Sequence, residues 1–294
     1  MQGRLAFYTA LAAIFLSVVF SARRLLHTPD ESALDDAAAF VRRHFGPGDA
    51  LILATPQMHG LRDRLGDLPW LDADALHADD TLPYARIFFL AQKMLWRAHQ
   101  PPRALPGATL TEEHSWSGVA LGVYQTPPTG ELLFDLGRDI KALQVSVHQR
   151  DGVAKLCRQF DRDRWTCPGE KAWNYVGQTY LEVEGTPRRC VWLHPFHDGR
   201  LLRLEAAVKP SDRVILTGAY GFSDHAARNA QAPVTLRINT GVGAPWVIRH
   251  GVQAGWKRLR QTLDTGDKIT IEVESTHPGA AHFCLDLKVV GAAP

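Results

Sequence analysis

The chain has 294 residues, of which 45% are hydrophobic and 22% are charged, and its formal net charge is +2. These are ordinary globular values, and they exclude a disordered tail protein, a collagen-like fibre and a polytopic membrane protein. With 33 basic and 31 acidic side chains there is no strong positive field, so a nucleic-acid partner is not expected. The length favours two domains of common size.

The N-terminal segment 1–27 contains an uncharged apolar run at residues 5–22. The run has about the minimum length of a membrane-spanning helix, so a retained anchor, the apolar part of a cleaved signal peptide and a buried helix all fit it. We expect the retained anchor, because cleavage after Ala22 would place the bulky Phe20 at the −3 position. The flanking basic residues are nearly balanced and leave the orientation open.

Residues 28–128 are expected to form a small α/β domain. Apolar side chains recur at helical spacing over 34–45, and Ser32 is the expected N-cap of this helix. Further helices are expected over 59–65 and 92–99.

Three short apolar runs in the same region predict buried strands, and they lie at 50–54, 84–91 and 118–124. Because helices alternate with these strands, we expect parallel pairing with helices on the faces of the sheet, in a Rossmann-like arrangement. The turn at 55–60 lacks the glycine spacing of a nucleotide-binding loop, so no cofactor is expected there.

Three sequences follow one another in this region: GPGDA at 46–50, RIFFLAQ at 86–92 and SGVALGVYQ at 117–125. Together with the apolar run they resemble the anchor and soluble extracytoplasmic tail of the membrane glycosyltransferases that take sugar from polyprenyl-phosphate donors. The resemblance covers about residues 5–126 and implies a body outside the cytoplasm. It does not imply transferase activity, because the acidic catalytic loop of that family lies among membrane helices that have no counterpart in this sequence.

Residues 129–294 are expected to form an antiparallel β-sandwich. Short strand-like runs follow one another between turns rich in Gly, Pro, Asp and Asn. Strands are expected at 143–149, 190–194, 201–208, 213–221, 234–240, 256–263, 268–276 and 282–290. Apolar and polar residues alternate most cleanly over 268–276, which predicts one solvated face. Over about 185–290 the pattern resembles the jelly-roll carbohydrate-binding modules of secreted bacterial proteins.

All four cysteines lie in this second region, and none forms the C-x-x-C spacing of redox or zinc sites. Four cysteines in a β domain behind a secretion signal suggest two disulfides. Of the three possible connectivities we expect Cys157–Cys167, which closes a hairpin, and Cys190–Cys284, which joins two strands. The alternative is four reduced, buried cysteines in a cytoplasmic protein.

No catalytic motif is found, so no catalytic and no metal-binding residue is expected. The candidate ligand-binding residues are Tyr220, Asp224, His225, Trp246 and Trp256. Trp246 and Trp256 flank a glycine-rich loop and are expected at the surface, where sugar rings stack on aromatic faces. Trp192, which alternates with Cys190, is expected in the core. The alternative for Asp224 is that it caps its loop or holds a structural Ca²⁺ with backbone carbonyls.

Two classes of function remain. The first is a non-catalytic, membrane-anchored extracytoplasmic protein whose sandwich binds a glycan or a protein partner in the cell envelope. The second is a glycan-directed enzyme of the envelope, or an accessory subunit of a membrane glycosyltransferase. We expect the first, because no catalytic signature accompanies the anchor and the β architecture. The body is expected in the periplasm or outside the cell, tethered to the inner membrane, or secreted if the N-terminal segment is cleaved.

Overall fold

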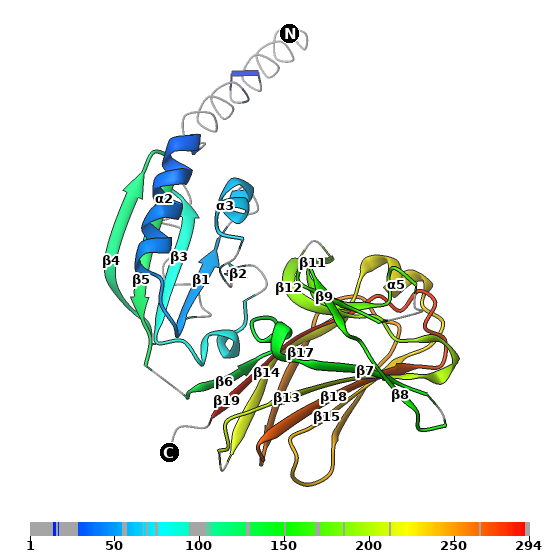
Figure 1. The fold of residues 1–294 in the computed structure, drawn as a ribbon. Helices are drawn as coiled ribbons and strands as arrows, with labels where there is room; N and C mark the ends of the chain where they lie inside the picture. Colours follow the sequence, from blue (N-terminus) through cyan, green and yellow to red (C-terminus); the bar gives the residue numbers. More distant parts are fainter. Residues whose placement is uncertain are drawn as a thin grey trace, which may run out of the picture. The chain divides into compact units, whose positions relative to one another are not determined.

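The computed structural model describes residues 14, 15, 17, 29–54, 58–66, 68, 70–73, 76–93, 105, 107–127, 130–149, 151–167, 171–184, 186–211, 213–264 and 266–291. The chain divides into two compact units (Figure 1). The first comprises Met1–Ala73 and Arg86–Thr126, and the second comprises Asp74–Ala85 and Pro127–Pro294. The segment Asp74–Ala85 therefore belongs to the second unit, whereas the sequence-based division placed it within the first domain, at 28–128.

The first unit is a five-stranded mixed sheet with strand order β2-β1-β3-β5-β4. Its strands are β1 (Asp49–Leu53), β2 (Trp70–Asp72), β3 (Arg86–Gln92), β4 (Thr109–Trp116) and β5 (Val119–Gln125). Strand β2, which the sequence did not predict, runs parallel to β1. The expected parallel pairing is confirmed for β1 with β3. It is wrong for β5, which runs antiparallel to both β3 and β4. The sheet is therefore mixed, and the Rossmann-like prediction is correct only in part.

Helix α2 (Glu31–His44) packs an apolar face on this sheet, and the short helix α3 (His59–Arg64) lies where a helix was expected. The N-cap of α2 is Asp30 rather than Ser32. A carboxylate oxygen of Asp30 accepts a hydrogen bond from the Ala33 amide at 2.7 Å, and the Ser32 hydroxyl donates to the same oxygen at 2.9 Å. A carboxylate therefore satisfies a free amide of the first turn, and the helix begins two residues earlier than expected from the sequence.

Two predictions lie largely outside the described residues. The first is the helix expected over 92–99. Gln92 is the last residue of β3, and residues 94–99 are not described. Of the apolar run at 5–22, only residues 14, 15 and 17 are described. In the part of the chain that the structure describes, no helix is long and apolar enough to cross a membrane.

The second unit is an antiparallel β-sandwich, as expected. Its eight-stranded sheet has the order β17-β14-β19-β12-β11-β10-β9, with β6 paired to β19, and its six-stranded sheet has the order β16-β15-β18-β13-β7-β8. The strands of the first sheet are β6 (Leu132–Asp135), β9 (Gln159–Asp161), β10 (Arg164–Thr166), β11 (Tyr175–Val183), β12 (Thr186–Leu193), β14 (Val214–Phe222), β17 (Lys257–Leu263) and β19 (Phe283–Gly291). Those of the second are β7 (Gln144–His148), β8 (Ala154–Leu156), β13 (Leu201–Ala207), β15 (Val234–Asn239), β16 (Trp246–His250) and β18 (Lys268–Ser275).

The core of the sandwich lies between the two sheets and is built from the inward side chains of both. Leu204 and Ile271 come from the six-stranded sheet and Leu216 and Leu285 from the eight-stranded one, and all four are essentially inaccessible. All eight strands expected from the sequence are present. A short helix, α5 (Asp224–Asn229), occupies the loop that the sequence predicted after β14.

Both expected disulfides are confirmed, Cys157 with Cys167 and Cys190 with Cys284. The described residues contain no free cysteine. Paired cysteines of this kind persist in oxidising compartments, so they indicate an extracytoplasmic protein and argue against the reduced, cytoplasmic alternative.

Candidate functional site

The outer face of the six-stranded sheet is a polar surface. Side chains alternate between the two faces of a strand, so the residues between the core positions of β13, β18 and β15 point away from the core. Two cross-strand rows result. One contains Arg203, Glu272 and Arg237, and the next contains Glu205, Thr270 and Asn239.

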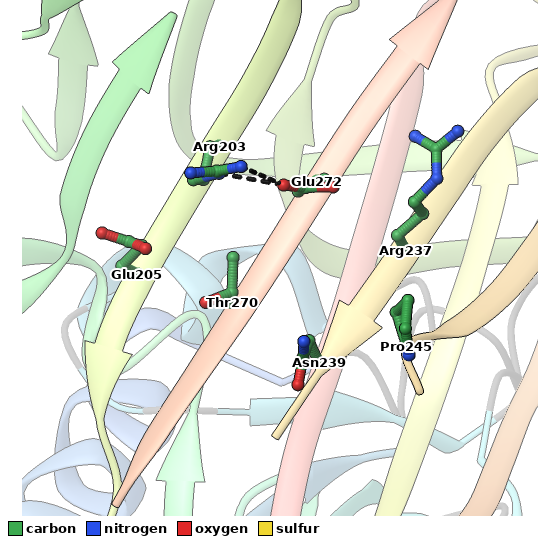
Figure 2. A pocket seen from close by; sticks show the side chains of 7 residues that line it. All are labelled: Arg203, Glu205, Arg237, Asn239, Pro245, Thr270 and Glu272. Atoms are coloured by element: carbon green, nitrogen blue, oxygen red, sulfur yellow. Dashed lines mark hydrogen bonds and ion pairs between the residues drawn. The ribbon is translucent and has the colours of Figure 1, made fainter. Parts of the chain in front are cut away.

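These two rows line a hollow of about 260 Å³, together with Pro245 at the start of β16. Figure 2 shows the lining side chains on the three neighbouring strands, with the Arg203 guanidinium turned toward Glu272. Ligand pockets for drug-sized molecules measure about 300–1,000 Å³, so a hollow of this size fits a single sugar ring rather than a chain.

Ion pairs hold the charged groups of the hollow in place. Arg203 donates two hydrogen bonds to Glu272 Oε1, at 2.9 and 2.6 Å. Arg237 contacts Glu274 at 2.6 Å, and Lys268 contacts Glu205 at 2.5 Å. Pairs of this kind are only partly exposed and fix the side chains that a ligand would meet.

The hollow thereby presents donors and acceptors side by side. Each paired arginine has further N–H groups, and each paired carboxylate has a second oxygen. Among the described residues, the Thr270 hydroxyl has no hydrogen-bond partner, and the Asn239 side chain uses only its oxygen, which accepts from the Gly241 amide at 2.8 Å. Neighbouring hydroxyls of a sugar donate and accept at once, and such a mixed, planar set suits them.

A second, shallower hollow of about 390 Å³ adjoins the first, since Glu205 lines both. It extends the polar surface across β13 toward Gln144 of β7. His148 lies on the same face, and its Nε2 is 2.9 Å from the Ser146 hydroxyl. Burial and then the nearby Arg203 lower the pKa of His148, which favours the neutral imidazole beside the arginine.

No family model and no curated protein sequence matches the chain. Several solved structures resemble parts of the chain. The xylan-binding domain CBM22-1 of Paenibacillus barcinonensis is 15% identical, with a TM-score of 0.30, over 56% of this chain and 98% of its own. The CBM51-2 and INT domains of a Clostridium perfringens protein are 10% identical, with a TM-score of 0.34, over 64% of this chain and 41% of theirs. An adhesin domain of Lys-gingipain from Porphyromonas gingivalis is 14% identical, with a TM-score of 0.28, over 37% of this chain and 76% of its own.

The sandwich thus resembles carbohydrate-binding modules at low identity, as the sequence pattern indicated. The resemblance of residues 5–126 to membrane glycosyltransferases finds no support among the matches.

The five ligand-binding residues expected from the sequence lie apart from this hollow. Trp246 and Tyr220 are half-buried and pack against the core. Trp256 is also half-buried, lies against Gly221 and donates its indole N–H to the Thr186 carbonyl at 3.0 Å. As ligand residues these remain predictions.

Asp224 and His225 begin helix α5. The Asp224 carboxylate accepts a hydrogen bond from the Glu184 amide at 3.0 Å, so it ties the β11–β12 turn to the helix, whose N-cap is Ser223. His225 is exposed and stacks on His282, with ring centroids 5.1 Å apart. The described residues contain no group of three or more His, Cys, Asp or Glu side chains that is arranged to hold a metal ion.

Trp192 does not lie in the core, so that prediction is wrong. It shares a face with Cys190, as the alternation required, but the core residues of β12 are Val191 and Leu193, and Trp192 is half-exposed on the other side. Its neighbours there are the rings of Tyr175 and His282. The alternation correctly placed Trp192 on the same face as Cys190. It could not show which of the two faces packs against the second sheet.

Proposed function

We propose that the chain is a non-catalytic, extracytoplasmic glycan-binding protein, and that the hollow lined by Arg203, Glu205, Arg237, Asn239, Thr270 and Glu272 binds the glycan. The observation that carries the proposal is the pair of cross-strand rows in which guanidinium, carboxylate, hydroxyl and amide groups alternate around a hollow of one-ring size. The two disulfides support the compartment. Residues 5–22 serve in this proposal as the membrane anchor that keeps the sandwich in the cell envelope.

The glycan would be held by hydrogen bonds rather than by ring stacking. Among the described residues, no aromatic side chain lines either hollow. Each hydrogen bond contributes about 1 kcal/mol net, and more where one partner is charged. The affinity for a single ring is therefore modest, and a chain that continues into the adjoining hollow beside Gln144 binds more tightly.

The test is a glycan array probed with the purified full-length protein and with single variants of the hollow. Arg237→Ala and Asn239→Ala each remove donors from the lining, and we expect each to weaken binding about five- to tenfold. Arg249→Ala is the matched control, because Arg249 is an exposed arginine of β16 that does not line the hollow.

Two results would count against this site. If the wild type binds no glycan on the array, the proposal fails. If the hollow variants bind as well as Arg249→Ala while Trp246→Ala or Trp256→Ala loses binding, the ligand is held by the residues expected from the sequence instead.

A further inference from the structure

The eight-stranded sheet has a row of aromatic rings on its outer face. Tyr175 of β11 lies against Trp192 of β12, with ring centroids 5.9 Å apart and planes 16° apart. Trp192 contacts His282 at 5.0 Å, and His282 stacks on His225 of α5 at 5.1 Å and 23°. We call Tyr175, Trp192, His282 and His225 the aromatic stripe. Four rings in succession, partly exposed, form a surface on which a flat ligand can stack.

A glycine makes room for the stripe. Gly177 lies between Tyr175 and the β10 residue Arg164, and it is the cross-strand partner of Trp192. A Cβ atom at this position would lie 2.6 Å from the Arg164 Cβ and 3.0 to 3.1 Å from atoms of the Tyr175 ring. The missing side chain therefore allows the Tyr175 ring to lie over the sheet beside Trp192.

Two cations stand over aromatic rings at one end of the stripe. The Arg164 guanidinium lies 5.3 Å from the centroid of the Tyr175 ring, and the Lys171 ammonium lies 5.1 Å from that of Trp173. Trp173 is 47% exposed, and its carbonyl accepts the indole N–H of Trp192 at 3.1 Å, which ties it to the stripe.

Neither cation is neutralised by a carboxylate in the described part of the chain. Asp161 is the cross-strand partner of Arg164 on β9, yet no ion pair joins them. This differs from the hollow on the other sheet, where Arg203 and Arg237 each have a glutamate. The local sequence also carries a net positive charge, because residues 154–173 contain five basic and three acidic side chains. A ligand that brings its own negative charge would complete these two sites.

We propose that the aromatic stripe, with Trp173, Lys171 and Arg164, is a second binding site, and that it binds an acidic polysaccharide. The sugar rings stack their C–H faces on the aromatic rings, and the carboxylates of the polysaccharide accept hydrogen bonds from the two cations. Single-stranded nucleic acid also combines flat rings with negative charge. The disulfides indicate an oxidising compartment outside the cytoplasm, and this favours the polysaccharide over nucleic acid.

The test measures binding of the full-length protein to polygalacturonate, to neutral galactan and to oligothymidylate by titration calorimetry. We expect polygalacturonate to bind most tightly of the three, and its affinity to fall as salt is added. The double variant Lys171→Gln/Arg164→Gln is expected to lose at least about tenfold in affinity for polygalacturonate. Trp173→Ala is expected to lose about threefold or more without affecting the fold, because that ring is exposed.

Matched controls lie on the same molecule. Arg213→Gln/Arg249→Gln removes two other exposed cations, and Tyr180→Ala removes an exposed ring from β11 whose side chain points to the opposite face from Tyr175. Both control variants are expected to bind polygalacturonate as the wild type does.

The site is overturned if polygalacturonate binds no better than galactan, if oligothymidylate binds more tightly, or if the site variants behave like their controls. Variants of the first hollow separate this proposal from the previous one. Arg237→Ala is expected to leave polygalacturonate binding unchanged. If it lowers the affinity for polygalacturonate as much as the stripe variants do, the aromatic stripe is not a separate site and this proposal is contradicted.

Discussion

Arg188 of β12 donates a hydrogen bond to Asp80 at 2.6 Å, and their side chains are only 4% and 2% exposed. Asp80 belongs to Asp74–Ala85, the segment that joins the second unit although the first unit surrounds it in the sequence. The same guanidinium contacts Asp286 of β19 at 2.7 Å, and Lys288 donates to Asp286 at 2.8 Å. Two buried cations and two buried anions therefore hold this segment against the sandwich.

The four groups keep one another charged. Burial works against a charge on Lys288 and on Arg188, but Asp286 and Asp80 outweigh that effect and raise the pKa of both basic groups. Burial likewise opposes ionisation of Asp286, and Lys288 and Arg188 overcome it and hold its pKa below the ordinary value. Removing any one of them would leave an unbalanced charge in a buried place.

Arg188→Ala is therefore expected to destabilise the second unit severely. The substitution leaves Asp80 without its cation and Asp286 with only one, and breaking a buried pair in this way costs about 3–5 kcal/mol. Urea unfolding of the variant and the wild type measures the difference. Arg213→Ala, at an exposed arginine, is the control and should fall within about 0.5 kcal/mol of the wild type. Equal stability of the two variants would contradict a structural role for the Arg188 network.

The two disulfides are expected to differ in their effect on stability. Cys190–Cys284 spans 94 residues, whereas Cys157–Cys167 spans 10. In the chain-entropy account, closing the longer loop stabilises by about 4.7 kcal/mol and closing the shorter one by about 3 kcal/mol. Unfolding of Cys190→Ala/Cys284→Ala should therefore begin at lower urea concentration than that of Cys157→Ala/Cys167→Ala. The reverse order would show that strain or packing, rather than loop length, decides.

The local pattern of apolar and polar residues predicted most strands of the sandwich. It did not predict strands that have no apolar face. The alternation over Lys268–Ser275 gave β18 correctly, because one side of that strand lies in the core and the other faces solvent. β4 reads TLTEEHSW and lies exposed at the edge of the first sheet, so no apolar run marked it. Because β4 was not predicted, β5 was expected to follow a helix and to pair in parallel. Its antiparallel pairing with β3 and β4 could therefore not be predicted.

The sites depended on contacts that no local pattern contains. Alternation over 268–276 predicts that Glu272 lies on the solvated face, but its pairing with Arg203 requires the register of β13 against β18. Arg188 and Asp80 lie 108 residues apart, and nothing near either residue indicates the other. The disulfides were predictable because only three connectivities existed, whereas an ion pair has many candidate partners.

Acidification is expected to weaken the fold between about pH 6.5 and pH 4. Burial lowers the pKa of His194 to about 4 and that of His250 to about 4, so the folded protein rejects protons that the unfolded chain binds from its ordinary value of 6.5 downward. Stability from these groups is thus fully present above pH 6.5 and is lost as the pH falls through this window. Each histidine contributes up to about 1.4 kcal/mol per pH unit.

Urea unfolding at several pH values between about 7 and 5 measures this slope. His194→Gln and His250→Gln should each lower stability at neutral pH and flatten the dependence by about one proton. A stability that is constant over this range, or that rises on acidification, would contradict the burial of the two neutral imidazoles.

Gly177→Ala is expected to disturb both the aromatic stripe and the pairing of β10 with β11. The new methyl group would lie 2.6 Å from the Arg164 Cβ, which is fixed to the β10 backbone, and 3.0 to 3.1 Å from atoms of the Tyr175 ring, which can turn away. Stacking of Tyr175 on Trp192 would then be lost, which changes the near-ultraviolet circular dichroism and weakens binding of polygalacturonate about two- to tenfold. Gly251→Ala is the matched control, because a Cβ there meets nothing within 4 Å. If Gly177→Ala keeps both the dichroism and the affinity of the control, the stripe does not depend on the space that this glycine leaves.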